Sequence, residues 1–181
     1  MRSAFDPSAS LPQGLTGLFE RSNVSLTIAD FTRPDCPLVG ANAAFFEMSG
    51  YGADEVIGHN CRFLQPEGGA GPVRARMRRF LKQPDALDGK FLIPNVTKGG
   101  EPFLNLVYMA KLQRHGETRL VLGSQFRVGR QIENESDLYD RALHEDLRQL
   151  NLLTSENNWV VLGSLDALAS SHSIIARIQY E

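Results

Sequence analysis

The chain has 181 residues, an apolar fraction of 42% and a formal net charge of −2 at pH 7. This length supports one globular domain with flanking segments, large enough to bury a core unaided. A charge so close to balance argues against wholesale binding to nucleic acid or to an anionic membrane surface. The sequence contains no run of eighteen apolar residues, so we expect no membrane-spanning helix.

The sequence contains 2 cysteines, Cys36 and Cys61, and neither belongs to a Cys-x-x-Cys pair. This spacing gives no zinc signature, and we expect no metal site. The first residues lack the unbroken apolar stretch of a signal peptide. We therefore expect a cytoplasmic protein with both thiols free. Cys36, in a loop between Asp35 and Pro37, is interpreted as a spare thiol.

Hydrophobic periodicity and turn residues divide the first part of the chain into short elements. Residues 1–14 are rich in Pro, Ser and Gly and are expected to be irregular. The predicted elements that follow are a cap helix at 15–22, a strand at 25–30, a loop at 31–37, a strand at 38–42 and two short helices between 42 and 57. A Gly-rich loop at 66–72 then leads into a clear helix at 73–83, which Pro84 ends.

Three strands complete the predicted domain, at 88–98, 101–114 and 117–131. The pairs Gly99-Gly100 and His115-Gly116 separate them, and such pairs supply the positive backbone angles of tight hairpins. The order of elements is strand, strand, several short helices and an antiparallel meander. This order predicts an α+β domain, in which helices pack on one face of a curved sheet.

After about residue 132 the sequence changes to amphipathic helical patterns. One predicted helix covers 134–157 and a second covers 164–181. Their apolar stripes exceed what a lone solvated helix carries, so they pack either on the sheet or on a second subunit. Trp159, between them, either locks these helices onto the sheet or lies in a subunit interface.

Three arginines are candidates for a phosphate site. Arg74 and Arg78 are four residues apart on the predicted helix and share a face, and Arg62 precedes that helix. Guanidinium groups bind phosphate well because each offers forked donors. The alternative is a solvated basic face, which spacing alone favours.

Amide side chains flank Cys61 and recur on the last three predicted strands; they are Asn60, Gln65, Asn95, Asn105 and Gln125. An amide that points into a core needs a hydrogen-bond partner. A planar heterocycle edged with carbonyls and ring nitrogens would satisfy several of them at once. The alternative, favoured for any single residue, is that each amide points outward to water.

Three motifs carry a resemblance to a known family. The stretch GHNCRFLQ, at 58–65, resembles the signature of the light-oxygen-voltage (LOV) photoreceptors, a branch of the PAS fold. NVTKGGEPFLNL, at 95–106, resembles that family's Asn-x-x-Lys-x-Gly…Phe-x-Asn-Leu stretch, and LGSQ, at 122–125, resembles its Gly-x-Gln. The resemblance implies a PAS/LOV fold, a five-stranded antiparallel sheet with short helices on one face.

The resemblance also divides the chain into three parts. Residues 1–23 are an N-terminal cap with a short helix, 24–130 are the LOV domain, and 131–181 are a C-terminal helical extension. The chain is similar to a short bacterial LOV protein without an effector domain. A homodimer formed through the terminal helices, with light-dependent affinity or geometry, is therefore the expected assembly. An unknown protein partner is the alternative, and neither nucleic acid nor a membrane is expected.

LOV proteins bind flavin mononucleotide (FMN), and the resemblance implies roles residue by residue. Cys61 is the expected photoactive thiol, which forms a reversible adduct with the light-excited flavin. Gln125 is expected to face ring nitrogen 5 and to pass on the signal by a flip of its amide. The other expected FMN contacts are Asn60, Leu64, Gln65 and Thr27, the arginines Arg62, Arg74 and Arg78 at the phosphate, and Asn95 and Asn105 at the pyrimidine edge.

Two positions depart from the family's pattern. Leu104 stands where many members carry tryptophan, and Thr27 stands where an apolar residue is usual, so both are expected to alter the adduct lifetime. Glu55 and Lys98 match a surface ion pair of the family. The implied function is that of a blue-light photoreceptor and not an enzyme. The alternatives are a PAS ligand-sensing or interaction module without light chemistry and a flavin redox enzyme, which the absence of a GxGxxG fingerprint disfavours.

Overall fold

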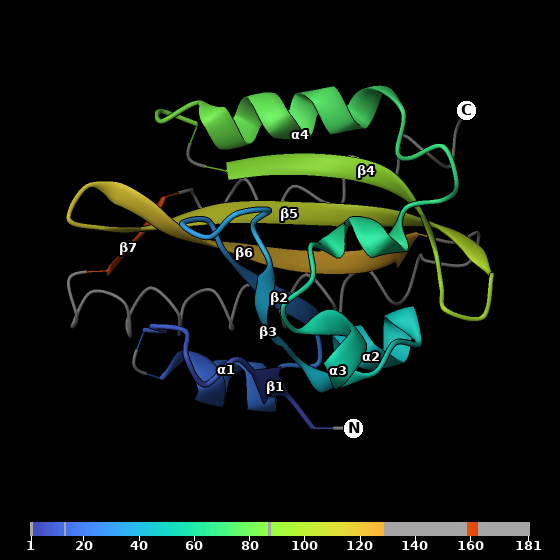
Figure 1. Cartoon of the computed structure of the whole chain (residues 1–181), viewed down its shortest axis with the longest axis horizontal. Coiled ribbons are helices and arrows are strands. Elements are labelled where there is room, and N and C mark those ends of the chain that lie inside the picture. The colour runs from blue at the N-terminus through green and yellow to red at the C-terminus, as the bar shows by residue number, and fades with distance from the viewer. Residues whose placement is uncertain (1, 13, 87, 129–158, 163–181) are drawn as a thin grey trace.

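One antiparallel sheet forms the centre of the computed structural model, which describes residues 2–12, 14–86, 88–128 and 159–162 (Figure 1). The strands are β1 (Ala4–Phe5), β2 (Ser25–Asp30), β3 (Leu38–Ala41), β4 (Asp88–Val96), β5 (Pro102–Arg114), β6 (Glu117–Val128) and β7 (Trp159–Leu162). The helices are α1 (Leu15–Arg21), α2 (Ala43–Ser49), α3 (Ala53–Val56), the 3₁₀ helix η1 (Cys61–Leu64) and α4 (Pro72–Lys82).

The strands are ordered β1-β3-β2-β6-β5-β4, and β7 pairs with β5 beside the end of β4. The α+β class and the antiparallel sheet are thus confirmed. The expected number of five strands is too low, because 7 strands join the sheet within the described residues. The two additional ones are the short strands β1 and β7, which are too brief to show a periodic hydrophobic pattern.

Turn and cap residues explain where the central elements begin and end. In the β5–β6 hairpin, His115 and Gly116 have φ angles of 54° and 80°, as a two-residue turn between twisted strands requires. Asn42 caps α2, since its side-chain oxygen accepts a hydrogen bond from the Phe45 backbone N–H at 3.1 Å. The same oxygen accepts one from the Leu26 N–H at 2.9 Å, which ties α2 to β2.

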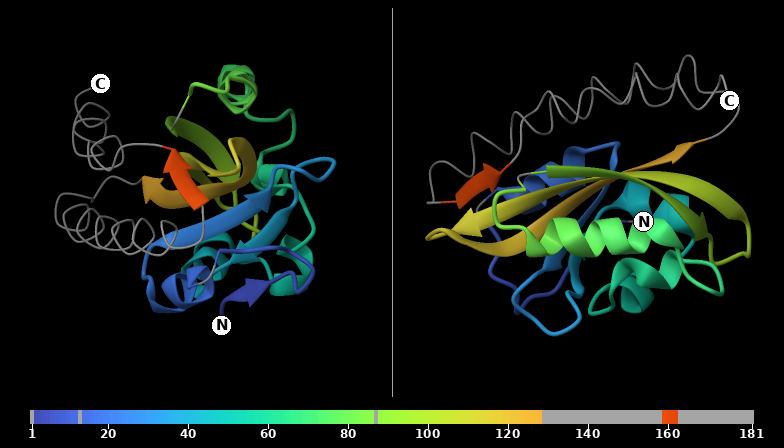
Figure 2. Two further views of the ribbon diagram at one scale, coloured as in Figure 1. Left: turned by 90° about the vertical axis from the view of Figure 1, so that its left-hand side faces the viewer. Right: turned by 90° about the horizontal axis from the view of Figure 1, so that it is seen from above.

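Alternation along the strands gives the sheet two different faces. On one face, Leu15, Leu18 and Phe19 of α1 pack into a buried cluster with apolar side chains of β2, β5 and β6. This confirms the predicted amphipathic cap helix. On the other face, η1 and α4 lie over the sheet, and α4 runs alongside β4 in the view from above (Figure 2). The space between these helices and the strands is the pocket described below.

The N-terminal residues differ from the prediction that they are irregular. Ala4 and Phe5 pair with Ala41 and Gly40 of β3, and the Phe5 ring lies 5.4 Å from that of Phe19. Packing against the core therefore orders a segment whose composition suggested a loop.

The two helices predicted at 134–157 and 164–181 lie outside the described residues. Between them the structure contains β7, a strand that begins at Trp159 and that the sequence pattern did not predict. Of the helices that the structure describes, none is long and apolar enough to cross a membrane.

Candidate functional site

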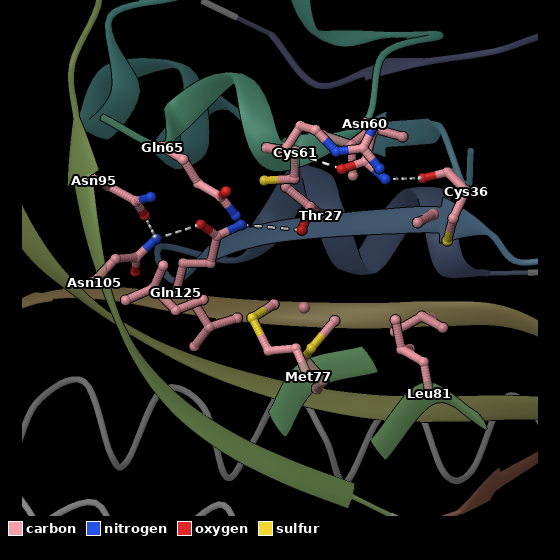
Figure 3. Close-up of a pocket in the computed structure, with 18 residues that line it drawn as sticks. Thr27, Cys36, Asn60, Cys61, Gln65, Met77, Leu81, Asn95, Asn105 and Gln125 are labelled. Carbon is pink, nitrogen blue, oxygen red and sulfur yellow. Dashed lines mark hydrogen bonds between the residues drawn. The ribbon is translucent and has the colours of Figure 1, made fainter. Parts of the chain in front are cut away.

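Cys61 opens the short helix η1, above the strands of the sheet. The side chain of Asn60 caps η1 by accepting a hydrogen bond from the Arg62 N–H at 3.0 Å. Its amide nitrogen also donates to the backbone oxygens of Asp35, at 2.5 Å, and Cys36, at 3.3 Å. Asn60 thus fixes both the start of η1 and the β2–β3 loop, and the Cys61 sulfur points into the pocket (Figure 3).

The pocket is lined by β2, β4, β5 and β6 on one side and by η1, α4 and the β2–β3 loop on the other. Most of the predicted site residues line it, namely Thr27, Asn60, Cys61, Arg62, Gln65, Asn95, Asn105 and Gln125. Apolar side chains separate these polar groups. On the strand side they include Ile93, Val107 and Met109.

A chain of side-chain hydrogen bonds crosses the floor of the pocket from β4 to β2 (Figure 3). The Asn105 amide nitrogen donates to the side-chain oxygens of Asn95, at 2.8 Å, and Gln125, at 2.7 Å. The Gln125 amide nitrogen in turn donates to the Thr27 hydroxyl at 3.1 Å. All of these residues are buried, so Asn95, Asn105 and Gln125 point inward and not outward to water, the alternative that the sequence favoured for any single amide.

One buried acceptor in this network has no protein partner. The side-chain oxygen of Asn105, a residue with 0% exposure, accepts no hydrogen bond from the described residues. Buried polar atoms of this kind are rare, because leaving one unpaired costs about 1–3 kcal/mol. The pocket therefore offers an unused acceptor to a ligand that carries an N–H or O–H group.

Gly123 makes room for the Thr27 hydroxyl at the end of the network. A Cβ atom at position 123 would lie 2.8 Å from the Thr27 hydroxyl oxygen, closer than such atoms approach. The two residues face each other in the β2–β6 ladder. The glycine of the LGSQ motif thus allows the contact between Thr27 and Gln125.

The two thiols of the chain share this pocket. Burial raises the pKa of Cys61 to about 12, against the opposing effect of a hydrogen bond with the Gln125 side chain. Burial also raises the pKa of Cys36 to about 11, and the carboxylates of Asp30 and Asp35 add to that shift. Both thiols are therefore protonated at neutral pH. Each residue is half-buried by surface area, since the pocket reaches the surface.

The three predicted phosphate-binding arginines do not converge in this structure. Arg62 lines the pocket and forms an exposed ion pair with Asp35, with 2.6 Å between nitrogen and oxygen. Arg74 and Arg78 are exposed on α4 and do not line the pocket. A Cβ atom on Gly69 would lie 3.9 Å from an Arg74 guanidinium nitrogen and 3.8 Å from the Gln65 side-chain oxygen, so these two groups flank the same glycine-rich loop.

Leu64 is a further predicted contact that does not line the pocket. It is 1% exposed and belongs to the core cluster beneath η1, with Phe45 and Val56, instead of lining the pocket. Its backbone oxygen accepts a hydrogen bond from the Asn95 side chain at 3.2 Å. Leu64 therefore helps to orient the Asn95 side chain through its backbone oxygen.

Several lining residues were not among the predicted contacts. Met77 and Leu81 project from α4 into the pocket, opposite the sheet (Figure 3). Their spacing of four residues is the signal that could have identified them, because it puts both on one helix face. Cys36 was interpreted as a spare thiol, and no sequence pattern indicated that its loop folds over the pocket.

Comparison with known proteins identifies the family of this domain. The family model described as PAS domain matches residues 23–126. The crystal structure of the Rhodobacter sphaeroides LOV protein superposes with a TM-score of 0.75 at 30% sequence identity, covering 91% of this chain and 93% of that one. The chain belongs to the LOV family of PAS domains.

Two relatives of this LOV protein carry names that refer to light. The blue-light-activated histidine kinase of Rhizobium johnstonii is 33% identical over 178 residues, which are 87% of this chain and 50% of the kinase. Phototropin-2 of Oryza sativa subsp. japonica is 35% identical over 138 residues, which are 75% of this chain and 15% of that protein. The chain thus spans half or less of the length of these relatives.

The expected family ion pair is also present, with 2.7 Å between Lys98 and Glu55, and both side chains are exposed.

Proposed function

We propose that this LOV protein is a blue-light photoreceptor that binds FMN and forms a reversible light-driven bond between the flavin and Cys61. One juxtaposition carries the proposal. The Cys61 sulfur and the buried amide network with its unused Asn105 acceptor line the same pocket. Membership of the LOV family and the light-related names of the relatives support it.

The residues of the pocket fit a flavin. The unpaired Asn105 oxygen is suited to the ring N–H of a flavin's pyrimidine edge, and the neighbouring Asn95 and Gln125 amides offer further polar atoms along it. Val107 and Met109 on one side and Met77 on the other supply apolar contacts for the faces of a planar ring. Polar groups at the edge and apolar groups at the faces are what an aromatic heterocycle requires.

When bound, flavin supplies absorption of blue light and a ring carbon that becomes reactive towards sulfur. Cys61 contributes the sulfur and, because its pKa is about 12, also the thiol proton. Gln125 can present either its oxygen or its amide hydrogens to the ring. In the resting protein, Thr27 and Asn105 hold it in one orientation. A turn of this amide would break the bond from Asn105, whose NH₂ group cannot accept, and would reverse the direction of the bond with the Thr27 hydroxyl. It would so alter the contacts between β6 and its neighbours β2 and β5.

The phosphate of FMN is assigned to the exposed arginines around the glycine-rich loop. Arg74 and Arg78 present their guanidinium groups on α4, which begins directly after this loop. Arg62 would have to exchange its exposed bond with Asp35 for the phosphate. Such an exchange is inexpensive, because an exposed ion pair contributes only about 0–1 kcal/mol.

For the output, we propose a non-enzymatic sensor that forms a homodimer through its terminal helices, with affinity or geometry that depends on light. The amphipathic patterns of 134–157 and 164–181 support this proposal. Light scattering of the full chain, in the dark and under continuous blue light, tests it. An unchanged molar mass and radius in both states would refute a light-dependent assembly.

Extraction of the bound chromophore tests the cofactor assignment. The purified protein should be yellow, and acid should release a compound with the mass of FMN. Release of riboflavin alone would remove the phosphate from the proposal. A protein that is colourless and takes up no added flavin would be a PAS module without light chemistry, the alternative function.

A further inference from the structure

A buried lysine, Lys111, lies two residues after Met109 on β5. Side chains alternate along a strand, so Lys111 is on the same face of the sheet as the pocket residues Val107 and Met109. It is 1% exposed, which is unusual because a buried ammonium group loses its hydration. Within the described residues no carboxylate forms an ion pair with it. Burial alone lowers the pKa of this group. A charged side chain held under such conditions needs a structural reason.

The Lys111 ammonium instead binds the carboxyl-terminal end of α4. It donates hydrogen bonds to the backbone oxygens of Phe80, at 2.8 Å, and Gln83, at 2.5 Å, and lies 4.7 Å from the centre of the Phe80 ring. The last carbonyl groups of a helix lack partners within the helix and carry the negative end of its dipole. Lys111 therefore caps α4 with a full positive charge.

The backbone of Lys111 is fixed on both sides. It pairs with Val121 of β6 and with Leu162 of β7. Next to it, the Phe80 ring packs against Phe91 of β4, with 5.6 Å between ring centres. The end of α4 is thus attached to β5, a strand that is paired on both of its edges.

The opposite end of α4 has a different character. The loop before it contains Gly68, Gly69 and Gly71, with φ angles of 92°, 83° and 62°. The helix carries Met77 and Leu81 into the pocket. Val73, in the first turn of α4, packs into the same buried cluster as Phe80. Because the connection before it is rich in glycine, the attachment at the other end contributes to the position of Met77 and Leu81.

We propose that Lys111 is a positioning residue of the flavin pocket: by capping α4 it holds Met77 and Leu81 against the face of the bound ring. This inference rests on the proposed flavin binding. It assigns Lys111 no contact with the flavin or its phosphate. It predicts that Lys111 affects affinity only through α4, and to the same degree for flavins with and without phosphate.

The test measures dissociation constants of FMN and riboflavin for the full-length apoprotein by quenching of flavin fluorescence. Lys111→Met, which keeps most of the side-chain volume, should raise both constants by the same factor, roughly tenfold. Leu18→Ala is the control, because Leu18 is buried in the cluster on the other face of the sheet. It should destabilise the protein and leave both constants within about twofold.

A combined variant separates positioning from general weakening. In a Met77→Ala/Leu81→Ala background, Lys111→Met should raise the constants much less than in the wild type, since it acts through those side chains. Amide exchange in the apoprotein should also accelerate at the end of α4 in Lys111→Met and not in Leu18→Ala. If Lys111→Met does not fold, Lys111→Gln replaces it throughout.

Three results would overturn the inference: unchanged constants in Lys111→Met, a loss confined to FMN, or a loss that is fully additive with the Met77 and Leu81 substitutions. If the wild type binds neither flavin, the proposed function fails as well. If the wild type binds both and Lys111→Met binds them equally well, only the role of Lys111 is refuted.

Discussion

Replacement of Asn105 by leucine tests the amide network at its centre. Asn105 is fully buried, and its amide nitrogen donates to both Asn95 and Gln125. Leucine has a similar size and no polar atoms. The substitution therefore leaves two buried acceptors without their donor and removes the acceptor that we assign to the flavin N–H.

The substitution should affect the stability of the apoprotein and the affinity for FMN by different amounts. Each unpaired acceptor costs about 1–3 kcal/mol. Two acceptors lose their donor, but the substitution also removes the Asn105 oxygen, which is already unpaired in the apoprotein. The unfolding free energy of the apoprotein should therefore fall by about 1–3 kcal/mol, the cost of one additional unpaired acceptor. The bond to the flavin exists only in the complex. Its loss leaves one ligand N–H unpaired and should raise the FMN dissociation constant about 10- to 100-fold.

Urea unfolding of the apoprotein and fluorescence titration with FMN measure these two quantities separately. Leu104→Ala is a suitable control, because Leu104 is the adjacent residue, is 40% exposed and does not line the pocket. It should change the FMN dissociation constant by less than about threefold. An Asn105→Leu protein that binds FMN as tightly as the wild type would refute the assignment of the pyrimidine edge to this residue.

Three further predictions concern Thr27, Arg78 and Cys61. Thr27→Val removes the acceptor that holds the Gln125 amide at 3.1 Å. The rate of dark recovery after a blue flash should change, while the FMN dissociation constant stays within about threefold of the wild type. An unchanged recovery rate would show that this hydrogen bond does not affect the decay of the adduct. Arg78→Ala should weaken FMN by about tenfold or more and leave riboflavin unaffected, and equal losses for both ligands would exclude a phosphate contact. The pKa of Cys61 rises from 9.0 in the unfolded chain to about 12 in the folded protein. The unfolding free energy should therefore fall as pH rises between these values, because the unfolded chain releases this proton first. Urea titrations at several pH values should show a shallower decline for Cys61→Ala than for the wild type.

The sequence predicted those parts of the fold that depend on local patterns. The hairpins of β4, β5 and β6 followed from turn residues such as His115-Gly116, and α1 and α4 followed from helical periodicity. The short strands β1 and β7 depend instead on partners far away in the chain. Phe5 is ordered by Phe19 and β3, and β7 by the edge of β5 that β4 leaves open. No local pattern encodes such contacts.

The site was predictable where polar residues stand in buried strands. Asn105 alone, among apolar neighbours on β5, left an outward amide as the favoured interpretation, and only the whole set of amides suggested the inward arrangement that the structure shows. Positions set by tertiary packing were less accessible. Leu64, the last residue of η1, points into the core. Cys36 lines the pocket on a loop that Asn60 and Arg62 bind from η1 and its N-cap. The role of Lys111 as a helix cap likewise depends on a contact across 31 residues of sequence.

An absorption spectrum before and after a blue flash tests the central claim most directly. The wild type should show a structured flavin band that bleaches on illumination and returns in the dark. Cys61→Ala should keep the band and lose the reversible bleaching, since it removes only the sulfur. A Cys61→Ala protein that bleaches and recovers like the wild type would contradict the account, because the light reaction would then not use this thiol.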